Sequence, residues 1–453
     1  MQDSKTHMKR TRLFLITLCL PAVFLCTACR HNHITFVDFT DPDNAKNLKF
    51  RVISQHETDL SQGLPYNCYM PDGTPVVEFS EISHQPSDGV PGPRKTTSIS
   101  GATLIQELMR FGQQDHLIEV VGIYPGTDSQ GNEITLSGKV LLPKWGKPKR
   151  LILVSHYTVG SNAEAPSNCF SLEGILTKMG YGLIIPDYRG YGITADQVHP
   201  YLVMRETAKN VTDMYFAVRE WLKAVDREPE KEEVNLMGYS QGGATTIAVE
   251  WLAETVYNNP NDSLYIPLHR VFAGGGPYDI RSSFERCVTS DYTDYPCSVP
   301  LVLQGMVVGH NLNIPMEVAM QKRLCDNLFN WVNSKRYTTD EINQFIGTHV
   351  THELITPEAM NLESEQLRPL FEAMTANSLI TYDWQPETPT FIMHSMDDET
   401  VPFLDAANLR DQWTNDNITY RFEHFGGHGM TCIQFISAVQ NMLAMEEKTH
   451  SLP

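Results

Sequence analysis

The sequence predicts an α/β protein with a mostly parallel central β-sheet, helices on both faces, an N-terminal extension and a helical cap insertion. Three observations predict this fold class. Short, almost continuous apolar runs of strand length recur along the chain, and helical segments alternate with them. Between two of the runs, a long stretch contains mainly helices and loops. Strands that are apolar throughout are buried on both faces, which is typical of parallel sheets covered by helices.

Composition excludes one class of partner. The chain has 453 residues, enough for one large domain with insertions or for two domains. Its formal net charge of −19 argues against nucleic acid as a partner, because phosphate binding relies on clustered lysine and arginine. Neither a His-Glu-x-x-His motif nor a Walker-type loop occurs, so we expect no metal or organic cofactor.

Residues 1–29 have the layout of an export signal. Basic residues precede an apolar stretch, Leu13 to Leu25, which is too short for a comfortable membrane span. The "CTAC" that follows resembles the lipobox of bacterial lipoproteins and makes Cys29 the expected lipidation site, although Cys26 stands where leucine is usual. We expect a lipid-anchored protein of the bacterial cell envelope, in the periplasm or at the outer membrane. Cleavage by an ordinary signal peptidase is the alternative.

The cysteines that follow the signal are candidates for disulfides, because an exported protein can meet an oxidising compartment. They are Cys68, Cys169, Cys287, Cys297, Cys325 and Cys432. Cys287 and Cys297 bracket a short loop that a disulfide could close, but the sequence does not fix the connectivity.

The remaining elements follow in chain order. Residues 30–112 are expected to form an N-terminal extension and linker, because turn residues dominate them until a short helix near "GATLIQELM". The core begins at residue 113 with two alternating runs, "HLIEVVGIYPG" and "ITLSGKVLLPK", which predict a hairpin. Four apolar runs complete residues 113–280: "RLILVSHY", "GLIIPDY", "EVNLMGYS" and "LHRVFAGGG". The long amphipathic helix "RETAKNVTDMYFAVREWLKAV" stands between the second and the third.

The last third of the chain divides in two. Residues 281–385 predict a mainly helical cap, because an insertion between two sheet strands usually covers the carboxyl ends of the strands. Residues 386–453 return to the core with "PTFIMHS" and "ITYRFEHF".

The pentapeptide Gly-Tyr-Ser-Gln-Gly, residues 238–242, places Ser240 where an apolar run gives way to helix-compatible residues. Glycine on both sides removes side chains that would collide in so sharp a turn. The motif therefore predicts a nucleophile elbow, with Ser240 exposed at the top of the sheet. A glycine-rich turn with an incidental serine is the alternative.

Partners for Ser240 are expected just after other apolar runs, because ligands bind beyond the carboxyl ends of parallel strands. After "PTFIMHS" comes Asp398, whose spacing to a Val-Pro pair favours it over Asp397 as the acid. After "ITYRFEHF" comes His428 in a glycine-flanked loop, whereas His424 is expected inside the strand with a structural or surface role. The chain order serine, acid, histidine is that of an α/β-hydrolase triad.

Each residue type suits acyl transfer. His428 can take the serine proton because an imidazole titrates near neutrality, and Asp398 can orient the ring and stabilise its charged form. Two backbone N–H groups must meet the oxyanion. We expect one from Gln241 and the other from Tyr157 or Thr158, after the run "RLILVSHY".

Several motifs together resemble those of the α/β-hydrolase superfamily and, within it, the secretory lipase family. They are "SHYTVGSNAEAPSN", "PDYRGYG", "HPYL" with "RETAKNVTDM", "GYSQGG", "MDDETVP" and "GGHG", and the resemblance covers roughly residues 113–445. It implies carboxylic ester hydrolysis, a helical cap, the triad Ser240, Asp398 and His428, and an oxyanion donor near Thr158. Tyr157 departs from the pattern, because related hydrolases often have glycine after the histidine.

The sequence thus predicts an exported serine esterase of lipase type that forms an acyl-enzyme on small-molecule esters. A serine peptidase is the alternative, because the same triad cleaves amides. From a different class, a non-catalytic envelope-binding module on a hydrolase scaffold would have no need to keep serine, aspartate and histidine in this order.

Overall fold

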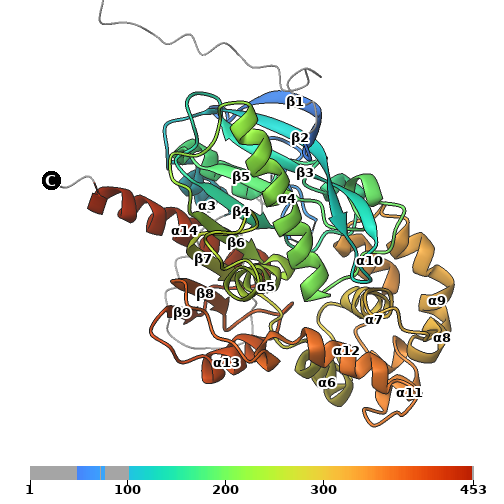
Figure 1. Cartoon of the computed structure of the whole chain (residues 1–453). Helices are drawn as coiled ribbons and strands as arrows, with labels where there is room; N and C mark the ends of the chain where they lie inside the picture. Colours follow the sequence, from blue (N-terminus) through green and yellow to red (C-terminus); the bar gives the residue numbers. More distant parts are fainter. Residues whose placement is uncertain (1–47, 72, 77–100, 451–453) are drawn as a thin grey trace, which may run out of the picture. The chain divides into compact units, whose positions relative to one another are not determined.

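A nine-stranded β-sheet runs through the described part of the chain (Figure 1). The computed structural model describes residues 48–71, 73–76 and 101–450, and the expected signal and lipidation site Cys29 lie outside them. The strands are β1 Arg51–Asp59, β2 His116–Thr127, β3 Glu133–Pro143, β4 Leu151–Ser155, β5 Gly182–Pro186, β6 Val234–Tyr239, β7 Leu268–Gly274, β8 Thr390–Ser395 and β9 Ile418–Glu423.

The sheet is antiparallel at one side and parallel elsewhere. Its order is β1-β2-β3-β5-β4-β6-β7-β8-β9, with antiparallel pairing from β1 to β5 and parallel pairing from β5 to β9. Every residue of β4, β5, β6 and β8 is buried, as expected for parallel strands covered on both faces. These observations confirm the predicted fold class.

The sequence pattern does not predict strand β1, which lies within the N-terminal extension. Its residues, "RVISQHETD", are mostly polar, and most of them are exposed. The strand pairs with β2 through its backbone, from Arg51 opposite Ile123 to Asp59 opposite His116. Backbone pairing of this kind leaves little mark on the side-chain sequence.

Helices cover both faces of the sheet. On one face lie α4 (Met204–Ala224) and α5 (Gln241–Thr255), which contact strands β2, β4, β5, β6 and β7. On the other face lie α3 (Gly101–Met109), the 3₁₀ helix η3 (Leu172–Met179) and α14 (His428–His450). Two shorter 3₁₀ turns, η2 (Asn162–Glu164) and η4 (Gly192–Thr194), follow β4 and β5, and α13 (Phe403–Gln412) follows β8.

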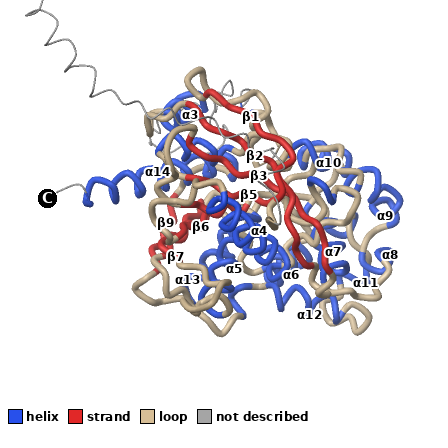
Figure 2. Tube along the Cα trace, turned by 45° about the horizontal axis from the view of Figure 1, so that its top comes forward, coloured by secondary structure: helices blue, strands red, loops and turns tan. Residues whose placement is uncertain are grey.

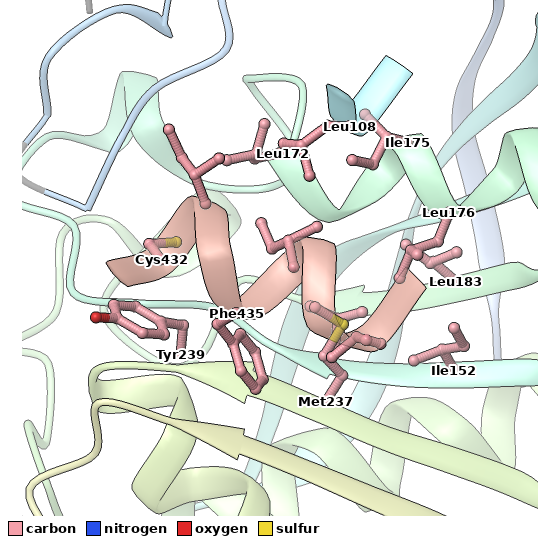
Figure 3. Close-up of a cluster of buried hydrophobic side chains, with 14 of the residues drawn as sticks. Leu108, Ile152, Leu172, Ile175, Leu176, Leu183, Met237, Tyr239, Cys432 and Phe435 are labelled. Atoms are coloured by element: carbon pink, nitrogen blue, oxygen red, sulfur yellow. The ribbon is translucent and has the colours of Figure 1, made fainter. Parts of the chain in front are cut away.

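Helix α14 fills the centre of one face with apolar side chains. Figure 3 shows Cys432 and Phe435 on this helix facing Tyr239 and Met237 of β6. The cluster also contains Leu108, Leu172 and Ile175, all fully or almost fully buried. Burial of this kind contributes roughly 25 cal/mol for each Å² of apolar surface removed from water. This packing holds α14 against β6 from Cys432 onward.

Residues 281–385, called here the helical insertion, lie between β7 and β8. Its elements are α6 Ile280–Ser290, α7 Ser298–Gly309, α8 Met316–Ala319, α9 Lys322–Leu328, the π-helix η5 Phe329–Asn333, α10 Thr339–Ile346, η6 Thr351–Glu353, α11 Pro357–Met360, α12 Arg368–Asn377 and η7 Leu379–Thr381. Helices α7 to α12 group together beside the sheet (Figures 1 and 2).

Two further expectations concern membranes and disulfides. Over the described ranges, no helix combines the length and the apolar character that crossing a bilayer requires. Among the described residues, none of the six cysteines beyond the signal is in a disulfide, and this includes Cys287 and Cys297.

Candidate active site

Ser240 lies on a sharp turn between β6 and α5, in a strained backbone conformation. Its φ of 59° and ψ of −127° are angles that a residue with a side chain rarely adopts. The turn is held by a hydrogen bond of 2.8 Å from the Ser240 N–H to the Gly274 carbonyl oxygen of the neighbouring strand. A sharp strand-to-helix turn of this kind is the geometry of a nucleophile elbow.

The glycines of the pentapeptide make the turn possible. A Cβ atom added at Gly238 would lie 2.2 Å from the carbonyl oxygen of Gly242. A Cβ atom added at Gly242 would lie 1.9 Å from the carbonyl oxygen of Ser155, at the end of β4. Both separations are far shorter than non-bonded atoms tolerate, and the atoms in the way belong to the backbone, so only glycine allows the helix to start this close to the sheet.

Asp398 and His428 come from different strand ends and form a buried pair. The Nδ1 atom of His428 lies 2.7 Å from Oδ2 of Asp398, and the Asp398 side chain is completely buried. The other carboxylate oxygen accepts the backbone N–H groups of Thr400 and Val401, each at 2.9 Å. These bonds fix the carboxylate, which in turn fixes the imidazole.

The main chain of His428 is tied to the residue before Ser240. The hydroxyl of Tyr239 donates to the His428 carbonyl oxygen at 2.8 Å, and the two rings pack with centroids 4.9 Å apart. Because Tyr239 ends β6 and His428 begins α14, this contact locks the histidine to the strand that carries the serine.

The pKa of Asp398 lies below its usual value. Burial alone raises the pKa, because it penalises the charged form. The opposing effects are stronger: the charge and hydrogen bond of His428, the nearby His394 and the backbone bond from Val401 all lower it. The carboxylate therefore stays ionised in a buried site, as an orienting acid must.

His394 and Glu399 were not predicted by sequence reasoning and lie beside the pair. The His394 side chain is fully buried, with Nε2 3.6 Å from Oδ2 of Asp398 and 3.1 Å from the Val401 carbonyl oxygen. Burial lowers its pKa, so the ring is a neutral donor. The sequence offered one signal for His394: it lies in an apolar strand, four residues before Asp398. Glu399 accepts the backbone N–H of His428.

The two residues set aside in favour of Asp398 and His428 lie at the surface. The carboxylate of Asp397 and the ring of His424 pair with each other at 2.7 Å, and both are about half exposed. One detail differs from expectation. His424 is not inside the strand, because β9 ends at Glu423 and the chain turns outward there.

Ser240 opens onto two neighbouring cavities. The larger, about 220 Å³, is lined by Ser240 and Thr158 from the core and by Phe284 and Val299 from the helical insertion. The smaller, about 50 Å³, is lined by both Ser240 and His428. The serine and the histidine therefore face one enclosed space.

The candidate oxyanion donors occupy different surroundings. Thr158 lines the larger cavity with Ser240, and its hydroxyl bonds with that of Tyr201 at 2.7 Å. Gln241 begins α5, and its side-chain Nε2 lies 2.8 Å from Nε2 of His199, a histidine to which the sequence assigned no role.

Tyr157 is directed elsewhere. Its hydroxyl donates to the Tyr69 carbonyl oxygen, and its ring packs in a small apolar cluster with Val159, Ala165 and Tyr191. The bulk of this side chain thus lies away from the larger cavity, whose lining does not include Tyr157.

Among the residues that the structure describes, no group of three or more histidine, cysteine, aspartate or glutamate side chains is arranged to hold a metal ion.

The sheet, the strained turn after β6 and the groups that follow β8 and β9 define an α/β-hydrolase. The model of the secretory lipase family matches residues 164–442, and the chain belongs to that family. It is therefore a carboxylic ester hydrolase, as the sequence motifs predicted.

Solved structures of low sequence identity share the fold. A rice cell wall degrading esterase, LipA from Xanthomonas oryzae, superposes with a TM-score of 0.63 at 19% identity, over 75% of this chain and 94% of that one. A Legionella pneumophila protein gives a TM-score of 0.64 at 19% identity, over 78% and 96%. Candida antarctica lipase A gives 0.52 at 18% identity, over 69% and 73%. Among curated proteins, no significant match is found.

Proposed function

We propose that the protein cleaves carboxylic esters by a two-step acyl-enzyme mechanism in which Ser240 is the nucleophile, His428 the base and Asp398 the orienting acid. The observation that carries the proposal is the bond of 2.7 Å between His428 and the buried Asp398, in a pair whose histidine shares a cavity with Ser240. A buried carboxylate that holds an imidazole next to a cavity lined by a serine has the roles that the triad chemistry requires.

The first step forms the acyl-enzyme. His428 takes the proton of the Ser240 hydroxyl while its oxygen attacks the ester carbonyl carbon. The negative charge that develops on the carbonyl oxygen is met by the backbone N–H groups of Gln241 and Thr158. When the tetrahedral intermediate collapses, the ester C–O bond breaks and His428 returns the proton to the leaving alcohol.

The second step releases the acid. His428 deprotonates a water molecule, which attacks the acyl-enzyme carbonyl, and the proton then returns to Ser240 as the carboxylic acid leaves.

Among the three candidate oxyanion donors, Thr158 is supported over Tyr157, because Thr158 shares a cavity with Ser240. Removing one such donor typically costs about 3 kcal/mol of transition-state stabilisation.

The size of the larger cavity supports a short acyl group. Pockets for drug-sized ligands measure about 300 to 1,000 Å³, whereas this cavity holds about 220 Å³. Phe284 of α6 and Val299 of α7 bound it from the helical insertion. We therefore propose that the helical insertion is a cap that limits acyl length.

Labelling with a fluorophosphonate probe tests the mechanism. We expect one label per chain on the wild type, at Ser240, and none on Ser240→Ala. Asp397→Asn is the matched control, because it alters a surface carboxylate beside Asp398 and should label as the wild type does. Labelling of folded Ser240→Ala, or its continued ester turnover, would refute the assignment.

A peptidase with the same triad is the second candidate. Membership of a lipase family favours esters, and a matched pair of substrates decides between the two. We expect 4-nitrophenyl butyrate to be hydrolysed and the corresponding 4-nitroanilide to be hydrolysed far more slowly. The opposite preference would establish a peptidase or amidase.

The family name also supports export, since secretory lipases leave the cell that makes them. Lipid attachment at Cys29 and residence in the bacterial cell envelope remain proposals that rest on the order of basic, apolar and small residues before that cysteine.

A further inference from the structure

Glu399 is a carboxylate that the triad mechanism does not use, although it touches the base. It follows Asp398 directly in the loop after β8. Both of its carboxylate oxygens lie 3.2 Å from the backbone nitrogen of His428, whose N–H they accept. Glu399 and Asp398 therefore bind the same histidine at two points, one at the main chain and one at the ring.

The main-chain contact is at the first residue of a long helix. His428 begins the 23-residue helix α14, whose side chains Cys432 and Phe435 lie in the apolar core described above. The first N–H groups of a helix lack partners inside it, and a negative charge there is favourable. Glu399 supplies that charge from a separate loop, so it holds the backbone from which the imidazole projects.

The residue before His428 leaves room for this contact. A Cβ atom added at Gly427 would lie 2.7 Å from both carboxylate oxygens of Glu399. Glycine at this position thus leaves the carboxylate of Glu399 free to approach the start of the helix.

The same carboxylate also faces the space where substrate binds. Glu399 lines both the larger and the smaller cavity, and so does Ser240. Two other charged side chains, Arg286 and Asp294, line the larger cavity, but neither lines the smaller one. Among the described residues, Glu399 is thus the carboxylate that lines both spaces next to the nucleophile.

We propose that Glu399 has two roles in ester hydrolysis: it is a positioning residue that holds His428 through its main chain, and it makes the site select against negatively charged esters. The inference rests on the proposed function, because it takes Ser240 as nucleophile and His428 as base. The charge also acts on the product. Hydrolysis converts a neutral ester into a carboxylate beside Glu399, and repulsion between the two favours its release.

Two substitutions separate the roles. Glu399→Gln keeps an oxygen acceptor for the His428 N–H and removes the charge, whereas Glu399→Ala removes both. Asp397→Asn is the matched control, because it removes a neighbouring charge that is paired with His424 at the surface. The substrates are 4-nitrophenyl butyrate, which is neutral, and mono-4-nitrophenyl succinate, whose acyl group has similar length and ends in a carboxylate.

For the positioning role, we expect Glu399→Ala to lower kcat for the butyrate about tenfold with little change in KM, because the base is less well placed. Glu399→Gln should restore most of that loss. For the charge role, the ratio of kcat/KM for succinate to that for butyrate should rise about fivefold in both variants at low salt. This rise should shrink as salt is added, and Asp397→Asn should not show it.

Two results would overturn the inference: a succinate-to-butyrate ratio unchanged in both Glu399 variants, or equal kcat losses in Glu399→Gln and Glu399→Ala. Circular dichroism checks that each variant is folded. If Glu399→Ala is unstable, Glu399→Gln alone still tests the effect of the charge on the succinate-to-butyrate ratio. Ser240→Ala is measured in parallel. If it still hydrolyses the butyrate, the proposed mechanism fails, and that outcome is distinct from any result with Glu399.

Discussion

The proposed catalytic roles rest on residues whose conformation or charge costs free energy in the folded protein. Ser240 has a positive φ, and Asp398 is ionised in a fully buried position. Each arrangement costs free energy that folding alone would avoid. Sequence reasoning selected Ser240, Asp398 and His428 because each lies within three residues of a glycine or a Val-Pro pair after an apolar run. It did not find His394 or Glu399, because their contacts depend on how separate loops meet.

At the triad, we expect Ser240→Ala and His428→Ala each to lower kcat by about 10⁴-fold or more, and the double variant to be scarcely worse. In the proposed mechanism the two residues act on one proton transfer, so their effects should not add. Steady-state hydrolysis of 4-nitrophenyl acetate measures this. Additive losses in the double variant would mean that the two side chains act in separate steps.

The lowered pKa of Asp398 predicts how stability depends on pH. A carboxylate whose folded pKa is depressed adds stability above its unfolded pKa, about 3.9, and loses it as pH falls through the folded value. The difference in unfolding free energy between wild type and Asp398→Asn should therefore shrink as pH falls from 7 to 3. Urea unfolding at both values tests this.

The control for this experiment is Asp397→Asn, whose side chain is about half exposed. It should give nearly the same small difference at both pH values. A wild-type advantage over Asp398→Asn that does not change with pH would mean that the loss comes from geometry and not from the charge of Asp398.

At the scale of elements, the apolar strands were predictable and the polar one was not. The sequence shows β4, β5, β6 and β8 as continuous apolar runs, because both faces of each strand are buried. Strand β1 pairs with only one neighbour and exposes most of its side chains, so backbone pairing forms it without an apolar pattern. In the helical insertion, the sequence pattern predicted helices but not the residues at which each helix begins and ends.

The strand-to-helix turn predicts a folding defect. Gly238→Val should destabilise the protein severely, because even the first carbon of the side chain would lie 2.2 Å from the Gly242 carbonyl oxygen. Gly131→Ala is the control: nothing lies within 4 Å of its added Cβ, so its cost should be limited to the positive φ of 83°. Thermal unfolding measured by circular dichroism compares the two. Equal stability of both variants would contradict the packing argument.

The helical insertion predicts a change in acyl preference. Phe284→Ala and Val299→Ala enlarge the larger cavity, so the ratio of kcat/KM for 4-nitrophenyl decanoate to that for acetate should rise about fivefold or more. Phe329→Ala, on η5, is the control, because its side chain is 69% exposed and lines neither of the two cavities. If the cavity variants change all esters by one factor, the helical insertion does not set acyl length.

At the scale of the whole molecule, the proposed lipid anchor rests on Cys29, which lies outside the described ranges. If Cys29 is lipidated, the protein should partition with membranes in a bacterium that processes lipoproteins, and Cys29→Ser should release it or leave it unprocessed. One acyl chain binds membranes only marginally, so firm partition indicates multiple acylation. Mass spectrometry of the mature N-terminus checks this, and an unmodified terminus would exclude the anchor.

The position of His428 at the start of α14 has a consequence for biosynthesis. Ser240 and Asp398 precede the base in chain order, and α14 completes the apolar layer over Met237 and Tyr239. If the proposed roles hold, a ribosome-bound chain that has not yet released α14 has its nucleophile and acid but no base, and one face of its sheet is uncovered. Under the proposed mechanism, docking of α14 both completes the core and brings in the base, so ester hydrolysis cannot begin before this helix has been synthesised and has packed on the sheet.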